Sequence, residues 1–241
     1  NIQKLVRRVK ELEMPAVALT DHGTMFGVIE FFNAAKAAGV HPVIGLEAYL
    51  APRRMGDRDA KLDKSAYHML LLAENDAGYQ NLLQIASAAQ LEGFYYTPRI
   101  DREYLAAHAE GLIATSGCMS AEVPRAIIEH GVDVAQRKLD WYYQVFGPER
   151  FFLELQSHPI PELDTINRTL LEVGKRYNAR YVATNDVHYI NKEDARYQDI
   201  MLAIQTGSLL TDPNRMKMTD NSYYLRTPQE MAELFGYIPE A

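Results

Sequence analysis

The hydrophobic and polar positions along the chain alternate between a helical period and a strand period. Residues 2–13 place apolar side chains three and four positions apart, which is the spacing of one face of a helix. Residues 16–20 (AVALT) follow as a short apolar run that is typical of a buried strand. This succession recurs as far as residue 186. It predicts strands at 16–20, 43–51, 67–74, 112–116, 151–156 and 180–186, and helices at 2–13, 25–38, 77–90, 121–130, 133–146 and 162–177.

The alternation of strands and helices indicates an α/β fold with a largely parallel sheet, and its regular return favours a barrel. The six predicted core strands are preceded by a helix, and a closed barrel would need at least one more strand. That strand would come before the helix at Asn1. Because the chain starts there with Asn rather than Met, we expect that its natural beginning is missing.

Two segments depart from the alternation. Residues 53–64 (RRMGDRDAKLDK) are charged and predict an exposed loop between two strands. Residues 208–241 contain a polar run, the strand-like stretch NSYYLRT and a helix TPQEMAELF with Thr227 as its N-cap. We therefore expect a barrel domain over residues 1–207 and an extension over residues 208–241.

Composition and charge limit the possible partners. Hydrophobic residues make up 47% and charged residues 24% of the chain, which is an ordinary globular balance. The single cysteine, Cys118, excludes an internal disulfide, and no apolar run approaches the roughly 20 residues that span a bilayer. We expect a soluble, cytoplasmic protein. A surface that holds duplex DNA is usually basic, but the net charge here is −7. Contact with nucleic acid would therefore be local, mediated by metal, or supplied by another part of a larger protein.

Function in parallel α/β barrels collects at the carboxyl ends of the strands. His68 opens its predicted strand instead of closing it, so this rule places it poorly. Asp186 and His188 stand two residues apart, and the same face of a strand would present both side chains. The polar residues at or near the strand ends are Asp21, His22, Glu47, Cys118, Glu154, Gln156, His158, Asp186 and His188.

Each of these residues also has a plainer interpretation. A lone Cys after Gly117 is usually a small buried hydrophobe, and Glu47 could pair with an arginine. Asp21 should point away from its neighbour His22 and form a structural hydrogen bond. We interpret three further histidines as surface or hydrogen-bonded residues, namely His41, His108 and His130.

The gathering of three His, an Asp, a Glu and a Cys near strand ends of one sheet favours a metal site. These residue types ligate Zn²⁺ and related divalent ions. Two or three close ions suit the hydrolysis of a phosphate ester, because they activate water and neutralise developing charge.

The stretch TDHGTMFGVIEFFNAAKAAGVHPVIGLEAYLAP closely resembles the PHP (polymerase and histidinol phosphatase) domain of bacterial DNA polymerase III alpha subunits. The resemblance continues in YHMLLLAENDAGYQNLLQIAS, FYYTPRID, ATSGCMSAEVPR, FFLELQSHPIPE, ATNDVHYI and NSYYLRTPQEMAELF. It implies a distorted, TIM-like barrel of mostly parallel strands with a cluster of metal ions at the carboxyl ends of the strands. The metal-ligand positions that it implies are His22, Glu47, His68, Cys118, Asp186 and His188.

The resemblance also carries expectations about individual roles. Asp186 and His188, the last ligand pair, are assigned as catalytic residues, and Arg99 in TPRID is assigned as a phosphate contact. His158 lies in a motif that is characteristic of the family but is not assigned as a ligand. Family members begin with a strand that carries His-x-His and a further acidic ligand, and nothing in this chain matches that segment. The cofactors implied are divalent ions, Zn²⁺, Mn²⁺ or Fe²⁺.

The resemblance leaves three functions open. The first is a metal-dependent 3′–5′ exonuclease that proofreads the primer end of DNA within a replicative polymerase. The second is an interaction module that braces the polymerase core or another replisome subunit. The third, a free-standing small-molecule phosphatase, fits less well, because the tail TPQEMAELFGYIPEA resembles a continuation toward a polymerase core.

Overall fold

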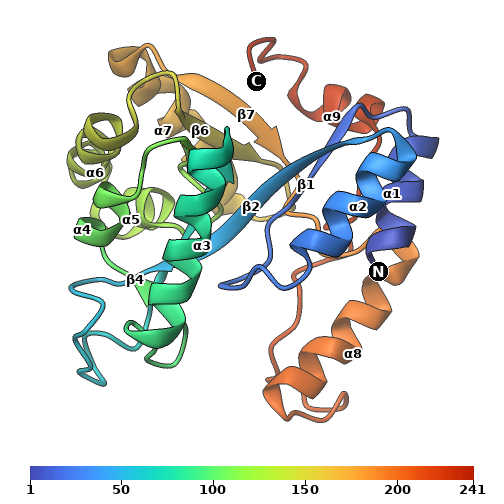
Figure 1. The fold of residues 1–241 in the computed structure, drawn as a ribbon, viewed down its shortest axis with the longest axis horizontal. Helices are drawn as coiled ribbons and strands as arrows, with labels where there is room; N and C mark the ends of the chain where they lie inside the picture. The colour runs from blue at the N-terminus through green and yellow to red at the C-terminus, as the bar shows by residue number, and fades with distance from the viewer.

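The computed structural model describes residues 1–241 and contains one mixed sheet with helices around it (Figure 1). The seven strands are β1 Ala16–Leu19, β2 His41–Leu50, β3 Tyr67–Ala73, β4 Arg99–Ile100, β5 Leu112–Thr115, β6 Phe151–Gln156 and β7 Arg180–Thr184. The α-helices are α1 Ile2–Glu11, α2 Val28–Ala38, α3 Asp76–Leu91, α4 Arg102–Ala107, α5 Glu122–His130, α6 Val132–Phe146, α7 Pro161–Gly174, α8 Ala195–Thr206 and α9 Pro228–Phe235. Two 3₁₀ turns complete the set, η1 Lys175–Tyr177 and η2 Lys192–Asp194.

The strands are ordered β1-β2-β3-β5-β6-β7, and β4 pairs with β2. The α/β class is confirmed, and most pairings are parallel: β1 with β2, β2 with β4, β5 with β6, and β6 with β7. β3 differs, because it runs antiparallel to both β2 and β5. The sheet curls but stays open, with β1 and β7 as its two ends.

The reversed direction of β3 decides where its first residues lie. Its register pairs Tyr49 of β2 with His68 and Leu50 with Tyr67. The beginning of β3 therefore lies beside the end of β2. His68, which the strand-end rule placed poorly, thus stands at the edge where the parallel strands finish.

A large hydrophobic core fills the space between the sheet and the helices α3, α5, α6 and α7. Leu71, Leu112, Phe151 and Leu153 contribute fully buried side chains from the strands to this core. A smaller core lies where α1 and α2 lie side by side, at the right of Figure 1. Its buried members are Val6, Val9, Phe31, Ala35 and Val40.

Local sequence signals explain several element ends. Gly39 ends α2 in the left-handed conformation at φ 74°, as its place after the apolar run predicts. The predicted N-cap Thr227 is confirmed, because its side chain accepts from the backbone N–H of Glu230 and forms a capping box. No helix is both long enough and apolar enough to span a bilayer.

Residues 222–238 attach to the core and to the segment that follows β7. Phe235 of α9 and the following Ile238 are buried members of the large core. The strand-like stretch NSYYLRT forms only an isolated bridge, between Tyr224 and Tyr189. Asn185 holds this stretch in place, because its side-chain amide donates to the carbonyls of Ser222 and Tyr224 at 2.8 and 2.7 Å.

Candidate metal centre

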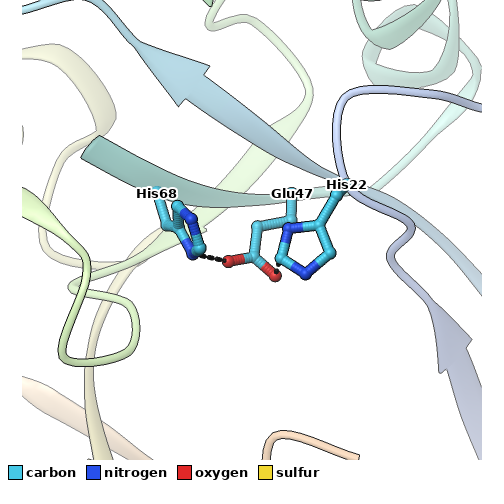
Figure 2. Close-up of side chains that lie close together, drawn as sticks. All are labelled: His22, Glu47 and His68. Carbon is cyan, nitrogen blue, oxygen red and sulfur yellow. Dashed lines mark ion pairs between the residues drawn. The ribbon is translucent and has the colours of Figure 1, made fainter. Parts of the chain in front are cut away.

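Three of the predicted ligands converge at the carboxyl edge of the sheet. His22 follows β1 and bridges to Glu47 of β2, while His68 is the second residue of the antiparallel strand β3. One ligand atom from each residue lies within 4.8 Å of the other two. Figure 2 shows both imidazoles turned toward the Glu47 carboxylate, with His68 Nδ1 at 2.5 Å and His22 Nδ1 at 3.7 Å from its oxygens.

Cys118 joins this group from the loop after β5. Gly117 turns the chain there at φ 75°, and its N–H donates to Thr115 Oγ1 at 3.1 Å. A side chain at position 117 would meet the Cβ of Ala121 at 2.6 Å, so only glycine fits this turn. The Cys118 sulfur consequently lies 3.5 Å from His68 Nδ1 and 3.9 Å from Glu47 Oε1.

Asp186 and His188 reach the same cavity by a route that strand alternation did not predict. β7 ends at Thr184, and Asp186 takes a left-handed conformation at φ 44°. The expectation of a strand through residue 186 is therefore wrong, and the pair lies on the irregular segment that follows β7. His188 Nδ1 lies 2.7 Å from the backbone oxygen of Asp186, and the His188 ring centroid lies 6.1 Å from that of His22.

All six predicted ligands line one cavity of about 390 Å³. Several other lining residues are not predicted as ligands from the sequence. Gln156 and His158 stand near a predicted strand end without a ligand assignment, and residues 198–218 carry no chemical motif. The other lining residues that add polar or aromatic groups are Tyr49, Ser120, Gln156, His158, Gln198, Gln205 and Tyr223.

Burial and neighbouring charges set the protonation of the cluster. Burial works to raise the pKa of Glu47, but the hydrogen bond from His68 and the nearby histidines outweigh it, so this pKa is lowered. Burial raises the pKa of Asp186 despite the neighbouring His188. Burial and the carboxylates of Glu47 and Asp186 raise the pKa of the Cys118 thiol well above its usual value. Imidazole, carboxylate and thiol donors around one cavity suit a divalent ion, which would favour the ionised forms of these acids.

A buried network behind the cavity ties three strand ends together. Glu154 of β6 accepts hydrogen bonds from Thr115 at 2.5 Å, Thr184 at 2.6 Å and Gln156 at 2.9 Å. Thr115 ends β5 and Thr184 ends β7, so this one carboxyl group links the strands that precede Cys118 and Asp186. Burial raises the pKa of Glu154 in spite of these donors.

The structure does not bring Arg99 to the cavity. Its side chain is fully buried and donates to the backbone carbonyls of Gly93, Asp63, Met55 and Asp57, at 2.8 to 3.2 Å. In place of the expected phosphate contact, Arg99 holds the loop of residues 51–66 against the end of β4.

The remaining histidines and Asp21 lie away from the cavity lining. The His108 ring stacks on Tyr104 with centroids 4.1 Å apart, and His130 is exposed beside Glu129. His41 is exposed at the start of β2. Burial raises the pKa of Asp21, although His22 acts against this.

Comparisons with known proteins show the family of the chain. The PHP domain family matches residues 1–158. The DNA polymerase III subunit alpha of Thermus aquaticus is 47% identical over 244 residues, which cover 100% of this chain and 20% of the relative. The same subunit of Borreliella burgdorferi is 43% identical, with 100% of this chain and 21% of the relative covered. The chain therefore spans about a fifth of the length of these relatives.

A solved structure with a similar outline comes from Bifidobacterium adolescentis and is provisionally described as a metal-dependent phosphoesterase. The two sequences are 14% identical, and the superposition covers 77% of this chain and 82% of the other chain, with a TM-score of 0.48. The family match extends over well more than half of the chain and includes His22, Glu47, His68 and Cys118. This chain belongs to the PHP domain family, and along its whole length it is similar to DNA polymerase III alpha subunits.

Proposed function

We propose that this PHP domain hydrolyses phosphodiesters with the help of divalent metal ions, as a 3′–5′ exonuclease within a bacterial replicative DNA polymerase. The observation that carries the proposal is the convergence of His22, Glu47 and His68, whose ligand atoms lie within 4.8 Å of one another. The other three predicted ligands line the same cavity. The names of the relatives support the assignment to replication.

In this proposal the metal ligands are His22, Glu47, His68, Cys118, Asp186 and His188, and the ions are Zn²⁺ or Mn²⁺. Bound ions would supply Lewis-acid activation of water and neutralise the phosphate charge. The residues of the chain orient these groups. The backbone oxygen of Asp186 can only accept, so His188 Nδ1 carries the proton and Nε2 keeps its lone pair for a ligand or a proton.

The net charge of −7 makes an extended DNA footprint on this domain unfavourable. We therefore propose that only the primer 3′ end enters the cavity, and that the polymerase core supplies the rest of the DNA contact. Residues 208–241 would lead from the barrel of residues 1–207 toward that core. The protein would work in the cytoplasm with other replisome subunits.

The test is excision of a mismatched primer terminus by the native-length protein, with and without His188→Ala. Loss of excision in this variant, with polymerisation retained, is the expected result. His130→Ala is the matched control, because His130 is 59% exposed and lies outside the cavity. Equal excision rates in the wild type and His188→Ala would reject the proposal.

The alternative is an interaction module that braces the polymerase core or a proofreading subunit without catalysis of its own. A group of exposed apolar side chains on and after α8 favours it, because such side chains are typical of protein contacts. They are Tyr197, Met201, Ile204, Leu209 and Leu210, which are 52% to 75% exposed. Native-length protein without stoichiometric metal, or metal that raises the melting temperature without nuclease activity, would support this alternative.

A further inference from the structure

The lining of the cavity includes a second group of side chains besides the predicted ligands, and the part of the lining that they form is called here its second half. It is built by α8, by the segment of residues 209–218 and by the start of α7. None of the side chains that line this half carries a charge. Those that matter here are Ile160, Gln198, Leu202, Gln205, Met216 and Met218.

An ion pair holds the wall of this half in place. Arg215 forms two parallel bonds to the carboxylate of Asp199 on α8, both at 2.6 Å. The Arg215 side chain is only 9% exposed, and it also donates to the backbone oxygen of Leu210 at 3.2 Å. Two parallel bonds fix the orientation of the Arg215 guanidinium relative to the Asp199 carboxylate as well as the distance between them. The segment that carries Met216 and Met218 is thereby pinned to α8 beside the cavity.

A further lining residue, His158, carries a buried hydrogen-bonding atom. His158 lines the cavity, and its Nδ1 is bonded to Ser222 Oγ at 2.6 Å. Its ring stacks on Tyr223 with centroids 4.0 Å apart, and its Nε2 is buried without a partner. Buried polar atoms are normally satisfied, so this unpaired Nε2 is an exception beside the cavity.

The chemistry of this half selects the kind of ligand. The amides of Gln198 and Gln205 can each donate and accept, as the edges of nucleobases require. Met216 and Met218 offer thioethers, which contact the edges and faces of aromatic rings favourably. A bare phosphate or a small alkyl phosphate would use only the half with the predicted metal ligands. A flat, neutral, hydrogen-bonding ring joined to a phosphate would fill both halves.

We propose that this second half is a subsite for the nucleobase of the 3′-terminal nucleotide of a nucleic acid strand. The inference rests on the proposed function, because it assumes that the phosphodiester lies at the predicted metal ligands. The subsite accepts any base, since amide side chains can rotate to match either donor or acceptor edges.

Photo-crosslinking tests the subsite without requiring catalysis. An unpaired DNA oligonucleotide with 4-thiothymidine at its 3′ end and a hydrolysis-resistant phosphorothioate as its last linkage is irradiated with the native-length protein in the presence of Mn²⁺, and the crosslinked peptides are mapped by mass spectrometry. We expect crosslinks in α8 or in residues 209–218. Loss of the thioether contact in Met218→Ala should lower the yield about tenfold, and Gln205→Ala, at an exposed position, should also lower it. Met201→Ala is the matched control, because Met201 lies on α8, is 59% exposed and does not line the cavity.

Competition separates base recognition from phosphate recognition. Thymidine monophosphate should suppress crosslinking at concentrations where inorganic phosphate does not. Crosslinks confined to other parts of the protein, yields unaffected by both variants, or equal competition by phosphate would each overturn the subsite. Crosslinking at this wall without any excision activity would reject the proposed hydrolysis and keep the subsite. Excision without such crosslinks would reject the subsite and keep the proposed hydrolysis.

Discussion

Replacing Arg99 with methionine removes the group that holds the loop of residues 51–66 in place. In the wild type, the guanidinium donates to the carbonyls of Asp63 at 2.8 Å, Asp57 at 2.9 Å, Met55 at 3.1 Å and Gly93 at 3.2 Å. Methionine fills part of the same volume but donates nothing. Three of the four acceptors belong to the loop, so the change weakens the attachment of the loop to β4 and leaves the metal ligands in place.

The size of the effect follows from these four bonds. A hydrogen bond from a charged donor contributes about 1.5–3 kcal/mol, and the values are not additive. Carbonyls of a detached loop regain water, so the net loss is smaller than the sum, roughly 3 kcal/mol. Every 1.4 kcal/mol or so is a factor of ten in an equilibrium. The open state of the loop should therefore become about a hundredfold more populated.

Hydrogen exchange followed by mass spectrometry measures this opening directly in the native-length protein. The amides of Asp59, Leu62 and Asp63 are hydrogen-bonded within the loop and report on it. The matched control is Arg58→Met in the same loop, because the exposed Arg58 makes only one long contact, 3.5 Å to the oxygen of Glu92. Unchanged protection in Arg99→Met, together with lost phosphodiester hydrolysis, would refute this reasoning and restore Arg99 as a phosphate contact.

Three further changes probe the cavity. In a metal titration, Glu47→Gln should weaken binding of Zn²⁺ or Mn²⁺ by at least about a hundredfold. The control Asp21→Asn lies outside the cavity lining and should leave metal binding unchanged. Equal losses in the two variants would contradict the assignment of Glu47 as a metal ligand. Burial raises the pKa of the Cys118 thiol above its usual value of 9.0. In the presence of a chelator, the rate of alkylation of this thiol should therefore rise with pH only above 9.0. A rise in alkylation rate at lower pH would contradict the burial of Cys118. Burial lowers the pKa of His158 from 6.5 to about 4, so its neutral form stabilises the fold fully above pH 6.5, and this contribution is lost as pH falls toward 4. Exchange of the imidazole C2–H, followed by mass spectrometry, should give a midpoint near 4, and a midpoint near 6.5 would contradict this.

The alternation of helical and strand periods was sufficient to predict the main helices and strands. Each of these elements buries one face, and the spacing of its apolar residues shows that face in the sequence. All six predicted strands are present, and the predicted helices differ from the observed ones by a few residues at their ends. The short strand β4 and the helices α4 and α8 were not predicted. β4 has only two residues, Arg99–Ile100. Two residues are too few to show a period, and β4 owes its pairing to β2.

The two halves of the cavity differ in how far sequence reasoning could reach. The predicted ligands are chemically distinctive residues near strand ends, so their types and positions together indicated a site. Gln198, Leu202 and Met218 are ordinary residues, and the place of Met218 depends on how the segment of residues 209–218 is held against α8. Arg99 was misplaced for a related reason. Proximity in sequence to a site does not reveal that a side chain turns inward to bind carbonyls of a distant loop.

His68 shows how connection length could have improved the prediction. The strands at 43–51 and 67–74 are joined by the charged loop RRMGDRDAKLDK, with no predicted helix between them. Parallel neighbours need a crossover that usually contains a helix, whereas antiparallel neighbours can be joined by a loop. The missing helix therefore indicates that the second strand returns beside the first. A returning strand begins at the edge where its parallel neighbours end, so His68, the second residue of this strand, belongs with His22 and Glu47.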